Sequence, residues 1–172
     1  GSFISCCRRQ KKVAQKWLMS QPTCTLHKNA RKRYPTRCYV VNNIDSQFQC
    51  DLTDMQQAAP HNNGYKYILT VIDILSKFAW ARPLKSKRGL EITDAFISIF
   101  NEGRIPKRIQ SDQEKEFENQ HVQRVMQENK VELFSVKSAY KAAMIERFNG
   151  TLKTKIWRYF TVKNTYKWVN EL

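Results

Sequence analysis

Three acidic residues of the 172-residue sequence are placed where a fold could bring them to one site. Asp51 lies in a strand-like stretch, Asp112 directly follows another, and Glu146 falls within a long helical stretch. Hard cations such as Mg²⁺ and Mn²⁺ bind oxygen ligands and keep several waters, so two or three carboxylates hold them without histidine. Phosphodiester chemistry commonly uses two such ions about 3.5 to 4 Å apart. If the three acids converge, they predict a two-metal site for this chemistry.

The helical stretch around Glu146 carries further polar groups at regular spacing. Its predicted buried stripe consists of Ile145, Phe148, Leu152 and Ile156. The neighbouring stripe consists of Glu146, Asn149, Lys153 and Trp157. An acid, an amide and an amine therefore lie in one row beside the core-facing surface, which suits a site for metal ions and phosphates. A solvated helix face explains the same spacing, and the sequence alone does not choose between the two.

Other acids compete for a place in such a site. Four of them lie near the three acids in the sequence, namely Asp54, Asp73, Glu114 and Glu116. Asp73 falls inside a strand-like run, where it either supports the metal ligands or occupies the edge of the sheet. None of these carboxylates is specific by its position alone.

The expected elements indicate how the three acids could meet. Alternation of apolar and polar residues predicts a strand that starts at Ile44, buries one face and carries Asp51 on the other. A hairpin loop at 61–64 follows. The remaining elements are expected as strands 65–75 and 78–84, a helix from 89 to near 103, strand 108–111, helix 119–129, strand 131–136 and helix 139–160. The order βββαβαβα predicts an α/β fold with a mixed sheet and helices on both faces.

The composition points to a polyanionic partner. Thirty Lys and Arg stand against fifteen Asp and Glu, for a formal net charge of +15. Nucleic acid is the first candidate for such a surplus, and a basic surface without that function is the alternative. We expect a basic N-terminal arm at 1–43 and a core domain at 44–172. The core is expected to be truncated at its C-terminus, because the sequence stops within an amphipathic, aromatic stretch.

The sequence also bears on the compartment. It contains no run of about 18 apolar residues that could span a bilayer, and no membrane partner is expected. Five cysteines at irregular positions fit reduced thiols better than a disulfide framework. Cys24 and His27 have the spacing of zinc ligands, but no second well-spaced pair follows. The protein is therefore expected to be soluble and intracellular, with the nucleus as its compartment.

Four segments, taken in order, resemble the catalytic core of retroviral-type integrases (rve). They are FQCDLTDM at 48–55, IDILSKFAWA at 72–81, SDQEKEF at 111–117 and ERFNGTLK at 146–153. The resemblance covers roughly residues 17–172. It is strongest to the integrases of Maverick/Polinton DNA transposons, which share further features at 25–28, 142–143, 155 and 157–160.

The resemblance implies an RNase H-like fold in which Asp51, Asp112 and Glu146 form a D,D,E triad that binds two Mg²⁺ or Mn²⁺ ions. It implies that Asn149 and Lys153 lie along the helix that contacts transposon DNA ends, and Lys141 is a further candidate for a phosphate contact. The implied reaction is 3′-end processing by water, followed by attack of the freed 3′-hydroxyl on target DNA. Transposon ends and target DNA are then the partners, and the enzyme acts as a homo-oligomer.

Two positions depart from the family pattern. Glu114 stands two residues after Asp112, where the family usually has a glycine with access to positive φ. Gly150 stands where retroviral relatives often carry lysine, and a glycine inside a helix costs about 1 kcal/mol relative to alanine. A catalytically inactive, transposon-derived DNA-binding module is therefore an alternative to the enzyme. A simple RNase H-like nuclease is a third hypothesis.

Overall fold

The computed structural model describes residues 13, 17, 20, 40–111, 116–135 and 143–172. The chain forms two compact units, Gly1–Cys38 and Tyr39–Leu172. Of the first unit, Val13, Trp17 and Ser20 are described, and all three are helical and exposed. The predicted basic arm at 1–43 lies mostly outside the described residues, and its boundary stays a prediction.

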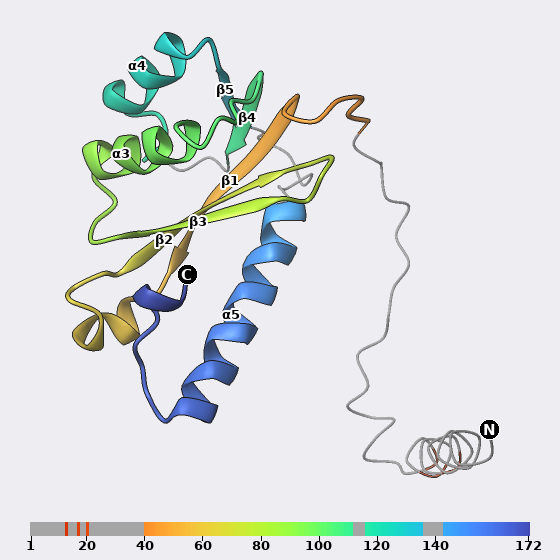
Figure 1. The fold of residues 1–172 in the computed structure, drawn as a ribbon, viewed down its shortest axis with the longest axis vertical. Coiled ribbons are helices and arrows are strands. Elements are labelled where there is room, and N and C mark those ends of the chain that lie inside the picture. Colours follow the sequence, from red (N-terminus) through yellow and green to blue (C-terminus); the bar gives the residue numbers. More distant parts are fainter. Residues whose placement is uncertain (1–12, 14–16, 18–19, 21–39, 112–115, 136–142) are drawn as a thin grey trace. The chain divides into compact units, whose positions relative to one another are not determined.

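A five-stranded mixed sheet forms the centre of the second unit (Figure 1). Its strands are β1 Gln47–Asp54, β2 Tyr67–Asp73, β3 Ala79–Leu84, β4 Arg108–Ser111 and β5 Glu132–Ser135. They lie in the order β3-β2-β1-β4-β5. β2 pairs antiparallel with β1 and β3, whereas β4 runs parallel to β1 and β5. The predicted strand order along the chain and the mixed sheet are confirmed, and β1 is the central strand.

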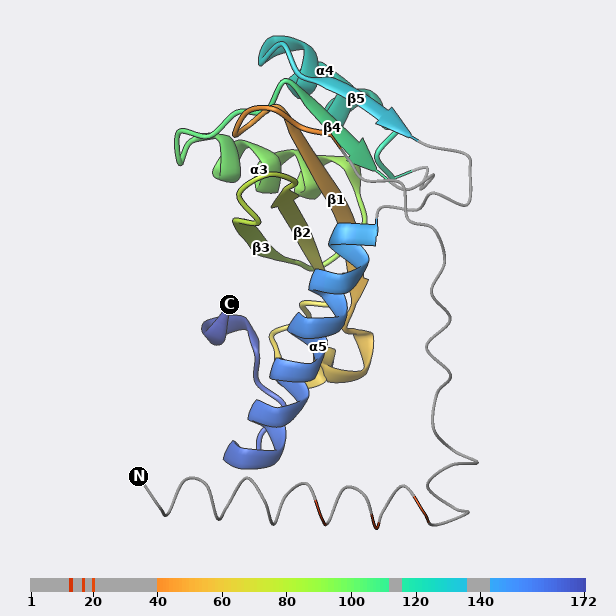
Figure 2. The ribbon, with the colours of Figure 1, turned by 90° about the vertical axis from the view of Figure 1, so that its right-hand side faces the viewer.

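Helices cover both faces of this sheet, as predicted (Figure 2). Helices α3 Gly89–Phe100 and α4 Gln120–Glu128 lie on one face, and α5 Ala143–Lys163 lies on the other. Residues of β2 contact the helices on both faces, because neighbouring residues of a strand point to opposite faces of the sheet. Val71 belongs to the same hydrophobic cluster as the residues of α3, whereas Ile72 packs with Ile145 of α5. Among the described helices, none combines the length and the apolar character needed to cross a membrane.

Both faces of β1 are buried, whereas its sequence alternation predicted burial of one face only. Phe48 and Cys50 belong to the core that also contains residues of α3 and α4. Gln49 points to the opposite face and is also 0% exposed, because α5 covers it. The prediction of a single buried face is wrong here, since a polar side chain can be buried when its groups find hydrogen-bond partners.

The start of β1 also differs from the prediction. The strand begins at Gln47 rather than at Ile44, whose side chain is 59% exposed. Asp45 adopts the left-handed region of the backbone, with φ of 61°, and this interrupts an extended chain. The local backbone therefore delays the strand by three residues relative to the apolar pattern.

Short helical turns that the periodicity did not predict join some of the elements. The 3-10 helix η1 Gln56–His61 follows β1, and its last residue is the first residue of the predicted loop at 61–64. Gly64 ends that loop with φ of +79°, a conformation that glycine adopts without strain. A second 3-10 helix, η2 Val169–Glu171, follows α5. The first residues of the predicted final helix, 139–142, lie outside the described residues.

Candidate active site

The carboxylate of Asp51 is fixed between β1 and α5. Its Oδ2 accepts a hydrogen bond from Nδ2 of Asn149 over 2.7 Å, and its Oδ1 accepts one from the backbone N–H of Leu52 over 2.8 Å. Asn149 lies on the sheet-facing side of α5 and is 7% exposed. Asp51 is half-buried and keeps access to solvent. One carboxylate of the predicted triad is therefore held in a defined orientation by a helix amide.

Asn149 also places an acceptor without a partner beside this carboxylate. Its Oδ1 is buried and has no hydrogen-bond partner among the described residues. An unsatisfied buried acceptor costs about 1 to 3 kcal/mol, and such groups in native proteins occur at sites that an ion or water completes. Amide and carboxylate oxygens are ligands that Mg²⁺ prefers. The oxygen donors of Asp51 and Asn149 therefore fit a hard divalent cation.

Glu146 lies in the first turn of α5, three residues before Asn149, and its side chain is exposed. Residues three apart are neighbours on a helix surface, so Glu146 belongs to the turn of α5 next to the Asp51–Asn149 pair. The third predicted ligand, Asp112, lies outside the described residues. Within the part of the chain that is described, no three His, Cys, Asp or Glu side chains form a group that could hold a metal ion.

The register of the sheet places the end of β4 beside the middle of β1, next to Asp51. Ser111 is the last residue of β4 and pairs in parallel register with Cys50 of β1. Asp112 and Asp51 directly follow these two partners in the sequence. Convergence of the two aspartates, on which the two-metal prediction depends, requires β1 and the strand before Asp112 to be neighbours, and β1 and β4 are neighbours. The position of the Asp112 side chain stays a prediction.

Two buried glutamines support the site, although the alternation of polar and apolar residues did not indicate their burial. Gln49 and Gln110 are partners in the register of β1 and β4 and are 0% and 2% exposed. Nε2 of Gln49 donates to Oε1 of Gln110 over 3.1 Å, and Oε1 of Gln49 accepts from the backbone N–H of Ile145 over 3.1 Å. The first N–H groups of a helix have no partner within the helix. Gln49 therefore caps the start of α5 from the central strand, two residues before Asp51.

The residues predicted to contact DNA divide into three cases. The amide nitrogen of Asn149 donates to Asp51, so its contact with DNA stays a prediction. Lys153 lies one helical turn further along α5, is half-buried, and forms no ion pair with the described carboxylates. Lys141 lies outside the described residues. Among the described residues of this set, Lys153 has a free ammonium group of the kind that a phosphate contact requires.

Asp73, a competing acid, has a structural role instead. It is fully buried and pairs with Phe48 in the register of β1 and β2. Its carboxylate accepts hydrogen bonds from the Ser76 hydroxyl and from Nη2 of Arg104, the latter over 2.7 Å. Burial alone would raise the pKa of Asp73, but the hydrogen bonds from Ser76, the backbone of Leu75 and Arg104 lower it below its ordinary value. The Asp73 carboxylate is therefore already bound by hydrogen-bond donors within the fold.

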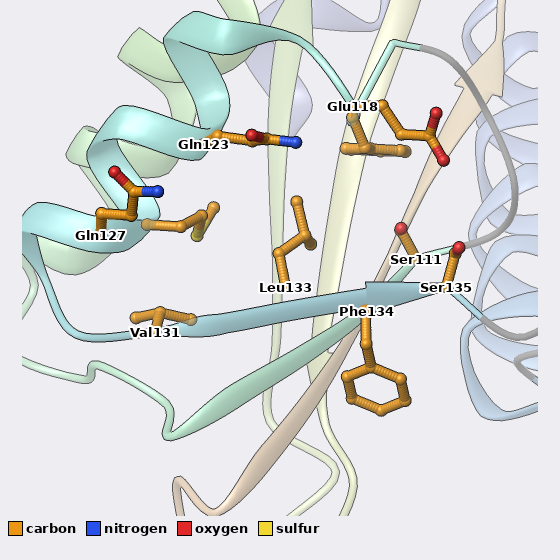
Figure 3. Close-up of a pocket in the computed structure, with 10 residues that line it drawn as sticks. Ser111, Glu118, Gln123, Gln127, Val131, Leu133, Phe134 and Ser135 are labelled. Carbon is orange, nitrogen blue, oxygen red and sulfur yellow. The ribbon is translucent and has the colours of Figure 1, made fainter.

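A cavity of about 500 Å³ is lined by residues of β4, β5 and α4 (Figure 3). Gln123 and Gln127 extend from α4 toward it, and Leu133 of β5 contributes an apolar surface. The hydroxyls of Ser111 and Ser135 lie at one end, where the paired strands β4 and β5 finish. Ser111, at this polar end, directly precedes Asp112 in the sequence.

Related sequences come from mobile elements and from a human protein. A transposon-derived protein of Caenorhabditis elegans is 41% identical over 119 residues, covering 69% of this chain and 42% of that protein. The retrovirus-related Pol polyprotein from transposon 297 of Drosophila melanogaster is 33% identical over 91 residues, covering 53% and 9%. KRAB-A domain-containing protein 2 of Homo sapiens is 37% identical over 79 residues, covering 46% and 16%. The chain thus spans less than half the length of each of these relatives.

Solved structures with a similar fold include a retroviral integrase core and a chain of a retroviral intasome. The HTLV-2 integrase catalytic core domain, in complex with magnesium and in a trimeric form, matches with a TM-score of 0.56 at 19% identity, covering 68% of this chain and 72% of that one. A chain of the simian T-cell lymphotropic virus intasome in complex with the PP2A regulatory subunit B56 gamma matches with a TM-score of 0.63 at 19% identity, covering 87% of this chain and 53% of that one. These similarities establish the RNase H-like fold. Since the integrase core domain family matches residues 42–142, more than half of the sequence, the chain belongs to that family.

Proposed function

We propose that this chain is the catalytic core of a DNA integrase or transposase, a polynucleotidyl transferase that processes 3′ ends and joins them to target DNA. The observation that carries the proposal is the Asp51 carboxylate on the central strand, held by Asn149 of α5 over 2.7 Å beside a buried oxygen without a partner. Membership of the integrase core domain family and the transposon-derived relatives support it.

In this proposal Asp51, Asp112 and Glu146 hold two Mg²⁺ or Mn²⁺ ions. When bound, such ions activate the attacking oxygen and stabilise the leaving oxygen of an in-line displacement. The protein supplies orientation: Asn149 fixes Asp51, and Gln49 fixes the start of the helix that carries Glu146. A rigid strand and a capped helix are suitable supports, because catalytic groups must be held within a fraction of an ångström.

Asn149, Lys153 and Lys141 are proposed to position DNA phosphates. In the first step, water attacks a phosphodiester near the 3′ end and the P–O3′ bond breaks. The short terminal segment leaves with a 5′-phosphate, and the new end of the retained strand carries a free 3′-hydroxyl. In the second step, that 3′-hydroxyl attacks a phosphodiester of target DNA, so that one P–O bond forms as another breaks. We further propose that the chain derives from a Maverick/Polinton-type element, acts in the nucleus and works as a homo-oligomer.

The test is a joining assay with the full-length protein and labelled terminal-repeat DNA, in Mg²⁺ and in Mn²⁺. We expect metal-dependent shortening of 3′ ends and joined products, both abolished in Asp51→Asn. If wild type and Asp51→Asn are equally inactive, the enzyme proposal fails. DNA binding that persists, with a salt dependence typical of several phosphate contacts, would then favour the inactive DNA-binding module. Cleavage of RNA in hybrids without joining would favour the nuclease.

A further inference from the structure

A second cavity, of about 400 Å³, lies between α5 and the segment that follows β1. Its polar and aromatic lining comes from Asp54, Gln56, Gln57, Lys153 and Trp157. Two of these residues continue the row of α5 that starts at the candidate active site, since Lys153 and Trp157 follow Asn149 at intervals of four residues. Residues four apart lie on the same side of a helix. The cavity therefore lies on the same side of α5 as Asn149, further along the helix from Asp51.

Trp157 presents an aromatic surface in a fixed position. Its side chain is 45% exposed, yet its ring packs edge-to-face on Phe160 with centroids 5.3 Å apart and an interplanar angle of 86°. Phe160 is itself buried in a hydrophobic cluster beneath α5. An exposed aromatic ring that is held by the core offers a stacking surface at little entropic cost, and nucleobases of every type stack on such rings.

The polar lining suits the edge of a base better than it suits a phosphate. The Asp54 carboxylate accepts from the backbone N–H and from Nε2 of Gln56, over 2.8 and 3.1 Å. This anion would repel a phosphate inside the cavity, whereas carboxylates and amides form hydrogen bonds with base edges. The Gln57 side chain forms no hydrogen bond with the described residues and is exposed. Lys153 provides the cation for a phosphate at the side of the cavity nearer to Asp51.

The position of the cavity determines how far a bound base would lie from the reacting bond. Trp157 lies eight residues beyond Asn149 in α5, which is about 12 Å along a helix axis at about 1.5 Å per residue. A DNA strand advances about 3.4 Å per nucleotide along a duplex, so the cavity is about three to four nucleotides away. A paired base is stacked within its duplex, so only an unpaired base can enter. We propose that this cavity binds one unpaired nucleobase of the DNA substrate, stacked on Trp157, with its neighbouring phosphate on Lys153.

This inference rests on the proposed function, because it takes DNA as the substrate. The first test measures binding of the full chain to a single-stranded oligonucleotide and to a fully paired duplex by fluorescence anisotropy. We expect Trp157→Ala to weaken single-strand binding about 10-fold, as base–aromatic stacking predicts, and to leave duplex binding unchanged. Trp157→Phe should retain most of the affinity, since it keeps a ring. Trp17→Ala is the matched control, because Trp17 is also exposed, at 63%.

The second test locates the base. The fluorescent base 2-aminopurine is placed at successive positions from the end of a duplex with an unpaired terminal segment, and its quenching by the protein is measured. We expect quenching to be strongest about three to four nucleotides from the cleaved bond and to be lost in Trp157→Ala but kept in Trp17→Ala. Circular dichroism of the variants checks that the fold is kept.

Several outcomes separate failure of this inference from failure of the proposed function. If wild type joins DNA while Trp157→Ala binds single strands normally, the cavity does not hold a base and the enzyme proposal stands. If Trp157→Ala weakens single-strand and duplex binding equally, the contact is with the backbone and the inference is wrong. A change in oligomeric state without a change in DNA affinity would assign the surface to a second copy of the chain. If the wild-type chain neither binds nor joins DNA, both proposals fall.

Discussion

Asn149 of α5 donates a hydrogen bond from Nδ2 to Oδ2 of Asp51 on β1 over 2.7 Å, and this bond joins the last long helix to the central strand of the sheet. The two residues are 98 positions apart in the sequence. The bond is charge-assisted, since its acceptor is a carboxylate, and such bonds are roughly twice as strong as neutral ones. The orientation of Asp51 therefore depends on how α5 is seated on the sheet.

The first prediction concerns Asn149→Ala. A residue that orients a metal ligand typically changes metal affinity 10- to 100-fold when it is removed. In the proposed site, Asn149→Ala should therefore weaken Mn²⁺ binding by about that factor, measured by isothermal titration calorimetry on the full chain. Thr151→Ala is the control, because Thr151 is exposed on the same helix and bonds only to the Arg147 carbonyl. Equal affinities in Asn149→Ala and wild type would show that the amide does not orient a ligand.

The second prediction concerns the cap that Gln49 provides. Gln49→Met keeps the length of the side chain but leaves the N–H of Ile145 without its acceptor. The Gln110 side chain keeps one hydrogen bond in this variant, because Nε2 of Gln47 still donates to its Oε1 over 3.3 Å. One buried N–H without a partner should lower the free energy of unfolding by about 2 kcal/mol, measured by urea denaturation.

Hydrogen exchange gives a local measurement of the same change. In Gln49→Met, amide protons in the first turn of α5 should exchange faster, while those of α3 should be less affected. Gln127→Met is the control, since Gln127 is exposed on α4 and its replacement should change stability by less than about 0.5 kcal/mol. If both variants are equally stable, the Gln49 side chain does not anchor the helix.

These contacts show which features the sequence could predict. The alternation in β1 and the apolar stripe of α5 placed Asp51 and Glu146 on the correct elements, because periodicity reports which side of an element faces the core. Periodicity did not reveal that Gln49 and Asn149 are buried, since it treats polar residues as solvent-facing. Their burial depends on partners from distant segments, and such pairings arise only when the sheet register is formed.

The third prediction concerns Asp73, whose fully buried carboxylate accepts hydrogen bonds from Ser76 and Arg104. Asp73→Asn weakens these charge-assisted bonds, so we expect it to lower the free energy of unfolding by about 2 kcal/mol at neutral pH. Glu128→Gln is the control. Its ion pair with Arg124 joins two exposed side chains, and its loss should cost less than about 0.5 kcal/mol.

The pH dependence of this effect has a defined sign. The pKa of Asp73 is lowered from its ordinary value of 3.8 by its hydrogen-bond donors, which outweigh burial. A depressed carboxyl pKa stabilises the fold above the unfolded-state pKa, and this stabilisation is lost as the pH falls toward the folded-state pKa. The stability difference between wild type and Asp73→Asn should therefore be constant from neutral pH down to about 5 and shrink below about 4. A difference that grows on acidification would contradict the assignment.

The last prediction concerns Gly150, an exposed glycine in the middle of α5. A Cβ atom added at this position would meet no other atom within 4 Å. Gly150→Ala should therefore raise the free energy of unfolding by about 1 kcal/mol, because alanine loses less backbone entropy in a helix. Thermal unfolding followed by circular dichroism measures the gain.

Gly89, at the start of α3, is the matched control because the same substitution should have the opposite sign there. A Cβ atom at Gly89 would lie 2.2 Å from Nδ2 of Asn119, so the Asn119 side chain would have to move. That side chain caps α4, since its Oδ1 accepts from the backbone N–H of His121 over 2.8 Å, and loss of such a cap costs about 1 kcal/mol. Gly89→Ala should therefore destabilise the fold while Gly150→Ala stabilises it. If Gly150→Ala is neutral or destabilising, the helix propensity of this position does not determine the stability of α5, and the prediction is wrong.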